Sequence, residues 1–143
     1  MKLIALFVAL SLAGQAANAQ TRPTQIPAKE IAPPGTARGL VDACDVMLEA
    51  VDRNFRQLPT PEDEGAYFTA GGYCMGYLEG FRNGYMVSSI QSGKTNICLP
   101  NGVTLEQIAR ILSKRLEQSP EMEHLPQFGF VSVVLAATWP CEG

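Results

Sequence analysis

Residues 61–92, with the sequence PEDEGAYFTAGGYCMGYLEGFRNGYMVSSIQS, are the stretch that decides the fold. Thr60 precedes this stretch as a candidate helix N-cap, and Pro61 suits the first helical position. Three acidic residues follow where the helix macrodipole favours negative charge: Glu62, Asp63 and Glu64. We therefore predict one long helix over residues 61–90.

Two rows at four-residue spacing run along this helix. One row is aromatic, with Tyr73, Tyr77, Phe81 and Tyr85, and the other consists of Gly72, Gly76, Gly80 and Gly84. Each glycine costs roughly 1 kcal/mol in a helix interior relative to alanine, so the row requires another backbone packed closely against it. That backbone belongs either to this domain or to a partner, including a second copy of the chain. We favour packing inside the bundle, because a small domain has few other ways to fill its core, and we expect the aromatic row in the core as well.

Apolar residues recur at helical spacing on both sides of this stretch. A first amphipathic helix is predicted from Leu40, Cys44, Met47, Leu48, Val51 and Phe55. A third helix begins with a capping box, in which Thr104 is the N-cap and Gln107 the third helical residue. Pro120 stops this helix, whose apolar face carries Leu105, Ile108, Ile111, Leu112 and Leu116.

The last helix is predicted from Pro126 to Thr138 and has almost no polar face. Such a helix belongs in the centre of a bundle or in a dimer interface. Its β-branched residues also suit a strand, but its length and its proline start favour a helix. The predicted fold class is all-α, a small four-helix bundle.

The N-terminal residues resemble a signal peptide. Lys2 supplies the positive charge, residues 3–12 are apolar, and Ala17-Asn18-Ala19 matches a cleavage site. The apolar run is too short to span a bilayer, which disfavours the alternative of a membrane anchor. We predict a signal peptide over residues 1–19, a proline-rich disordered tether over residues 20–38 and one helical domain over residues 39–143, in a periplasmic protein.

The net charge limits the class of partner. The full chain carries 11 basic and 14 acidic residues, and removal of residues 1–19 takes away one basic residue and no acidic one. An acidic chain lacks the basic face that nucleic acid or an anionic membrane requires. We predict neither nucleic-acid binding nor membrane insertion after cleavage.

Four cysteines in an exported chain indicate two disulfides: Cys44, Cys74, Cys98 and Cys141. The turn between the first two helices lies near Pro59, with Cys44 and Cys74 fifteen residues on either side. Equal distances from an antiparallel turn place two residues at the same height, as a bridge requires. The same argument about the turn near Glu121 pairs the other two cysteines. We predict Cys44–Cys74 and Cys98–Cys141.

The sequence offers no convincing catalytic or metal site, so we predict that the protein is not an enzyme and has no cofactor. Gly93-Lys94-Thr95 resembles the end of a P-loop, but the first glycine is replaced by Ser88 and a helix precedes it instead of a strand. His124 is the only histidine, and we expect it to form a cap or a hydrogen bond at the turn before the last helix. The acidic cluster after Pro61 is explained by helix electrostatics.

Four segments together resemble the Rap/Tai family of type VI secretion immunity proteins. They are residues 73–80 (YCMGYLEG), residues 97–104 (ICLPNGVT), Ser119-Pro120 with His124, and residues 135–141 (LAATWPC). One departure is Arg82-Asn83, where the family pattern leads us to expect an acidic residue.

The resemblance implies an exported helical protein that binds and occludes a peptidoglycan amidase effector from a sister cell. The element expected to enter the amidase is the polar loop formed by Ser92, Gly93, Lys94, Thr95 and Asn96, because it is a loop tip held near Cys98. A homodimer is also possible. The alternative function is that of a periplasmic helical chaperone or envelope-stress protein, while a peptidoglycan-acting enzyme would lack a nucleophile.

Overall fold

The computed structural model describes residues 32–53 and 61–141, and this part of the chain contains four α-helices and no strand. The predicted signal peptide, most of the predicted tether and the proposed cap Thr60 lie outside the described residues, as do the side chains of the acidic cluster at 62–64. The helices are α1 (Ala37–Asp52), α2 (Pro61–Ser92), α3 (Leu105–Gln118) and α4 (Gln127–Thr138). The all-α prediction is confirmed.

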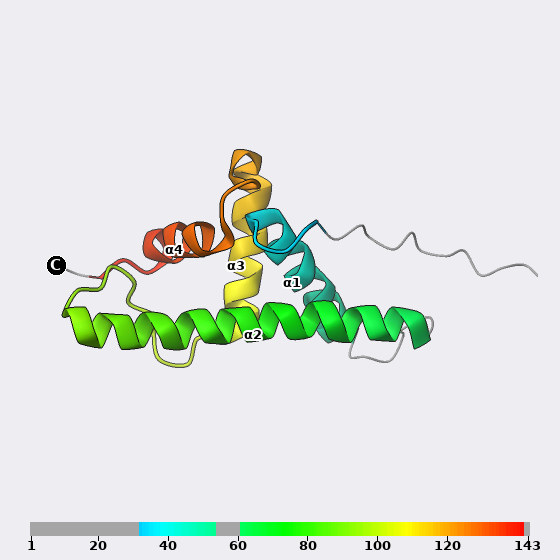
Figure 1. Ribbon diagram of the computed structural model, residues 1–143, viewed down its shortest axis with the longest axis horizontal. Coiled ribbons are helices and arrows are strands. Elements are labelled where there is room, and N and C mark those ends of the chain that lie inside the picture. Colours follow the sequence, from blue (N-terminus) through cyan, green and yellow to red (C-terminus); the bar gives the residue numbers. More distant parts are fainter. Residues whose placement is uncertain (1–31, 54–60, 142–143) are drawn as a thin grey trace, which may run out of the picture.

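Helix α2 forms the long axis of the molecule. Figure 1 shows it running horizontally, with most of α1, α3 and α4 above it in the view. In this view α3 stands upright on α2 and α1 crosses it obliquely, whereas α4 runs roughly along the direction of α2. With 32 residues, α2 is twice as long as α1, which has 16.

Helix α1 begins where Thr36 caps it. The Thr36 Oγ1 accepts a hydrogen bond from the Gly39 backbone N–H at 3.1 Å, which satisfies one of the free donors at the helix start. The helix therefore includes Ala37 and Arg38, the last two residues of the predicted tether. Ala37 also donates its N–H to the carbonyl oxygen of Leu125 at 2.8 Å, which ties this end of α1 to the segment before α4.

The two predicted disulfides are both present. Cys44 on α1 and Cys74 on α2 are fully buried, with Cα atoms 5.0 Å apart. Cys98, which precedes α3, is bonded to Cys141, which follows α4, again with Cα atoms 5.0 Å apart. The first bridge fixes α2 against α1 inside the core, and the second joins the two chain segments at the far end of the molecule.

The predicted capping box of α3 is confirmed in both directions. The Gln107 N–H donates to Thr104 Oγ1 at 3.2 Å, and the Thr104 N–H donates to Gln107 Oε1 at 3.0 Å. Helix α3 ends at Gln118, and the segment Pro120–Met122 forms one 3-10 turn before α4.

The core lies between the inner faces of the four helices. Helix α4 contributes Phe130, Val131, Val134 and Leu135, all buried, and α3 contributes Ile108, Ala109, Leu112 and Leu116. Not all of α4 is covered, since Phe128 and Val133 are 63% and 51% exposed. The aromatic row of α2 packs as predicted: Phe81 is buried, and the three tyrosines are half-buried against the core.

The glycine row of α2 does not pack inside the domain, so the interpretation that we favoured is wrong. Gly72, Gly76, Gly80 and Gly84 are exposed, and a Cβ placed on any of them would meet no atom within 4 Å. The reason is helical geometry. Cys74 must face α1, and a residue two positions away lies about 200° around an α-helix, on the opposite side.

None of the described helices has the length and apolar character needed to span a membrane.

Candidate partner-binding loop

Helix α2 ends in an exposed loop, residues 92–96, which we call the 92–96 loop. Gly93 has a φ of +64°, the left-handed conformation that terminates many helices, and its N–H donates to the Ser89 carbonyl oxygen at 3.0 Å. The Ser92 hydroxyl donates to the Ser88 carbonyl oxygen at 2.8 Å and accepts from the Lys94 N–H at 3.3 Å. The chain therefore leaves the helix in a defined turn.

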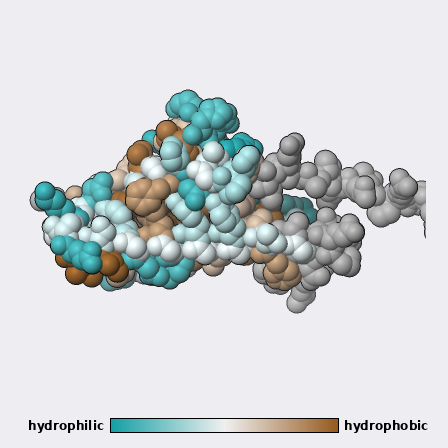
Figure 2. Space-filling model, viewed as in Figure 1, coloured by the Kyte–Doolittle hydropathy of each residue, from teal (hydrophilic) through white to brown (hydrophobic). Residues whose placement is uncertain are grey.

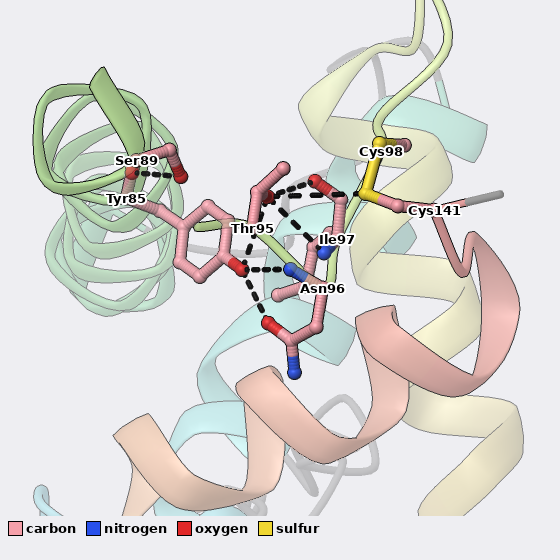
Figure 3. Close-up of a disulfide and its surroundings, with 7 residues drawn as sticks. All are labelled: Tyr85, Ser89, Thr95, Asn96, Ile97, Cys98 and Cys141. Carbon is pink, nitrogen blue, oxygen red and sulfur yellow. Dashed lines mark hydrogen bonds between the residues drawn. A yellow bond between two sulfur atoms is a disulfide. The ribbon is translucent and has the colours of Figure 1, made fainter. Parts of the chain in front are cut away.

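Tyr85, two turns before the end of α2, holds the far side of this loop. Its hydroxyl accepts hydrogen bonds from the Asn96 backbone N–H at 3.0 Å and from Thr95 Oγ1 at 3.3 Å, and it donates to Asn96 Oδ1. Figure 3 shows the tyrosine ring reaching from α2 to these residues. Sequence reasoning placed Tyr85 in the core and missed this contact, because nothing in the spacing of the aromatic row distinguishes its last member.

The hydrogen bonds at Tyr85 also affect its ionisation. Burial alone would raise the pKa of the phenol, but hydrogen bonds from Thr95 and from the backbone of Asn96 and Ile97 outweigh it, and the pKa lies below its usual value. This hydroxyl accepts two hydrogen bonds from the loop and donates one, so it serves mainly as an acceptor.

Beyond Asn96 the chain is fixed to the C-terminal segment. Ile97 is 5% exposed and forms an isolated bridge with Pro140, while the Cys98 N–H donates to the Trp139 carbonyl oxygen at 2.9 Å. The Cys98–Cys141 disulfide closes the same junction (Figure 3). Thr95 is tied to the same junction, since the Thr95 hydroxyl donates to the Ile97 carbonyl oxygen at 3.0 Å.

All five residues of the 92–96 loop are exposed, although the chain is anchored before, within and after it. Lys94 provides its one charged side chain. A polar, exposed loop whose backbone and several of whose side chains are already held by hydrogen bonds can enter a groove of another protein with little ordering cost.

Other candidate chemical groups are dispersed. His124 is 87% exposed at the turn before α4, with Nε2 at 3.1 Å from the Glu123 carboxylate, and it makes no cap to the helix. All four cysteines are in disulfides, and no cluster of potential metal ligands occurs in residues 32–53 and 61–141. Gly93-Lys94-Thr95 follows a helix, so the context of a P-loop is missing.

The structure thus defines a small, disulfide-bonded helical protein that presents a rigid polar loop, as a protein-binding module does. The model of the Rap1a immunity proteins matches residues 36–141, and the chain belongs to this family. Its members are non-enzymatic and confer immunity to a type VI secreted amidase effector, which they bind. This family assignment favours immunity over the chaperone alternative, and with the two disulfides it indicates a location in the cell envelope. No curated protein and no solved structure matches the chain.

Proposed function

We propose that this protein neutralises its cognate amidase by inserting the 92–96 loop into the catalytic groove and excluding the peptidoglycan substrate. The observation that carries the proposal is the triple anchoring of an otherwise exposed loop by Gly93, Tyr85 and the Cys98–Cys141 disulfide. An inhibitor that binds in one preformed conformation avoids most of the entropic cost of ordering a loop.

The proposal places the protein in the periplasm, where a peptidoglycan amidase would act. A signal peptide over residues 1–19 would deliver it there and be cleaved, so that the mature chain would begin at Gln20, ahead of the folded domain. Two disulfides are consistent with an oxidising compartment. Mass spectrometry of the protein from a periplasmic extract should find Gln20 at the N-terminus.

The test compares two charge reversals in one inhibition assay. Lys94→Glu changes the 92–96 loop, whereas Lys114→Glu makes the same change at an exposed lysine of α3. With the amidase encoded beside this gene, the wild-type protein should block peptidoglycan hydrolysis near equimolar ratio. Lys94→Glu should raise the concentration required for half-inhibition at least tenfold, and Lys114→Glu should leave it unchanged.

The outcomes separate the two parts of the proposal. If the wild-type protein neither binds nor inhibits that amidase, the enzyme is not its target. If all three proteins inhibit equally, the amidase is the target but the 92–96 loop is not the element that enters it. Circular dichroism of each variant verifies that the fold is intact.

Self-association is a further part of the proposal, because the open glycine row leaves one long face of α2 without a neighbour within the chain. We propose a homodimer, and sedimentation equilibrium of the purified protein measures it directly.

A further inference from the structure

Helices α3 and α4 form a small pocket between them, which we call the α3–α4 pocket. Its volume is about 200 Å³. Pockets for drug-sized ligands span roughly 300–1,000 Å³, so this one has room only for a single small group, such as the end of a peptide. The residues that line it are Ile111, Lys114, Arg115, Gln118, Val134, Ala137 and Thr138.

The two walls of the α3–α4 pocket differ in chemical character. Helix α3 provides the guanidinium of Arg115 and the amide of Gln118, with the exposed Lys114 beside them. Helix α4 provides the methyl groups of Val134 and Ala137. Figure 2 shows hydrophilic surface around the C-terminal end of α3, at the top of the view, and apolar surface over α4. A ligand that suits both walls carries a negative charge next to a small apolar group.

The guanidinium of Arg115 has no ion-pair partner in residues 32–53 and 61–141. Its Nε is shielded from solvent and has no hydrogen-bond acceptor in the same part of the chain. The other arginines of this part all lie in ion pairs, and they are Arg38, Arg53, Arg82 and Arg110. A shielded N–H of a charged group is rarely left without an acceptor in a folded protein, which indicates an acceptor that a ligand supplies.

A structural role at the helix end does not account for this arrangement. Arg115 lies in the last turn of α3, where a positive charge stabilises the helix through its macrodipole. That effect requires only the charge, and an exposed side chain provides it equally well. It therefore does not explain why Arg115 Nε is shielded from solvent in the wall of a pocket.

The groups of the α3–α4 pocket match the C-terminal residue of a peptide. A carboxylate suits a guanidinium, because its two oxygens match the planar fork of N–H donors. The Thr138 hydroxyl donates to the Val134 carbonyl oxygen at 2.8 Å and can still accept an N–H, while the Gln118 amide can donate or accept. The methyl groups of Val134 and Ala137 provide an apolar surface for a small side chain.

We infer that the α3–α4 pocket binds the C-terminal carboxylate of a short peptide whose last residue is small and apolar, with Arg115 as the residue that binds the carboxylate. Capture of a terminal carboxylate is a recurring mode of peptide recognition. Here a guanidinium takes the part that backbone N–H groups take elsewhere. This binding function goes beyond neutralisation of the amidase and does not rest on it.

Titration of the full-length folded protein with acetyl-alanyl-alanine tests the inference. Backbone amide signals around the α3–α4 pocket should shift in proton–nitrogen NMR spectra, and their concentration dependence gives the dissociation constant. Acetyl-alanyl-alanine amide lacks only the negative charge, so its dissociation constant should be about tenfold higher or more, because charge-assisted hydrogen bonds are the stronger ones. Inorganic phosphate, which has no apolar group, should also bind more weakly than the peptide.

Two arginines on α3 provide a matched pair of variants. Arg115→Met keeps an unbranched side chain and removes the charge, so it should raise the dissociation constant of the peptide about tenfold or more. Arg110 is held in ion pairs with Asp52 and Glu106, and Arg110→Gln should bind the peptide as the wild type does. Circular dichroism verifies the fold of both variants.

If Arg115→Met does not fold, Ala137→Leu provides a second test, because it fills the pocket from an exposed position of α4. This variant should fold and should lose peptide binding. The inference is overturned if the peptide shifts no signals around Arg115, or if the peptide amide or phosphate binds as tightly as the peptide. Wild-type affinity in a folded Arg115→Met or Ala137→Leu variant would overturn it as well. Amidase inhibition is measured separately, so failure of either proposal is recognised without the other.

Discussion

At single residues, two glycines of this chain have opposite surroundings. A Cβ at Gly39 would lie 2.2 Å from the Pro33 carbonyl oxygen, which is backbone and cannot move aside cheaply, whereas a Cβ at Gly84 would meet nothing within 4 Å. Gly39→Ala should therefore lower the free energy of unfolding by about 1–3 kcal/mol through overpacking. Gly84→Ala should raise it by about 0.5–1 kcal/mol, because alanine is the better helix former. Urea denaturation followed by circular dichroism measures both, and equal effects would contradict the packing at Gly39.

The Tyr85 hydroxyl gives a second prediction at this scale. Tyr85→Phe leaves the Asn96 N–H without this acceptor and Asn96 Oδ1 without this donor, so it should cost about 0.5–1.5 kcal/mol and loosen the 92–96 loop. Amide hydrogen exchange at Asn96 should accelerate markedly. Tyr77→Phe, two turns earlier on the same helix, should leave that exchange rate as in the wild type. If both variants exchanged alike, the tyrosine would not be an anchor of the loop.

At the scale of whole elements, the two disulfides make different contributions. The Cys44–Cys74 bridge spans 30 residues of sequence and the Cys98–Cys141 bridge spans 43. In the chain-entropy model each bridge adds about 4 kcal/mol to the free energy of unfolding. Replacing Cys44 and Cys74 by alanine should cost more, because both are fully buried and their loss also opens space in the core. Replacing Cys98 and Cys141 should act mainly on the end of the molecule that holds the loop, and trypsin should then cleave faster after Lys94. Unchanged cleavage would show that Gly93 and Tyr85 hold the loop without the disulfide.

The elements themselves were predictable because their signals are local. Thr104 and Gln107 specify the start of α3 in four consecutive residues, and helical periodicity defined the other helices closely. The disulfide pairing followed as well, from the positions of the cysteines relative to two turns. Each of these inferences depends on neighbours in sequence or on one hairpin.

The prediction that failed concerns the side of α2 on which the glycines lie. Their spacing alone shows that a row exists, and the choice between a partner within the chain and one outside it depends on how α2 is rotated. The bridge from Cys74 to Cys44 fixes that rotation, because it turns the Cys74 side of α2 toward α1 and the glycines away from it. The contact from Tyr85 to Asn96 is different, since it depends on the path of a loop that no periodicity describes.

For the molecule as a whole, the proposed homodimer determines how many targets it can bind. Each copy presents its own 92–96 loop, so the dimer should bind two amidase molecules, and light scattering should give the mass of a 2:2 complex. A 2:1 complex from the wild type would show that one bound amidase blocks the second loop.

The order of the disulfides along the chain has a consequence for biogenesis. Cys44 pairs with Cys74 and Cys98 with Cys141, so each bridge joins consecutive cysteines and neither encloses the other. A polypeptide that emerges from a translocation channel N-terminus first presents its thiols in this order, and the first pair can be oxidised before the third thiol appears. An oxidase that joins successive cysteines then produces the native bridges with no need for isomerisation. Protection against an incoming toxin would thus be ready as soon as secretion of the chain is complete, without a slow step of disulfide reshuffling.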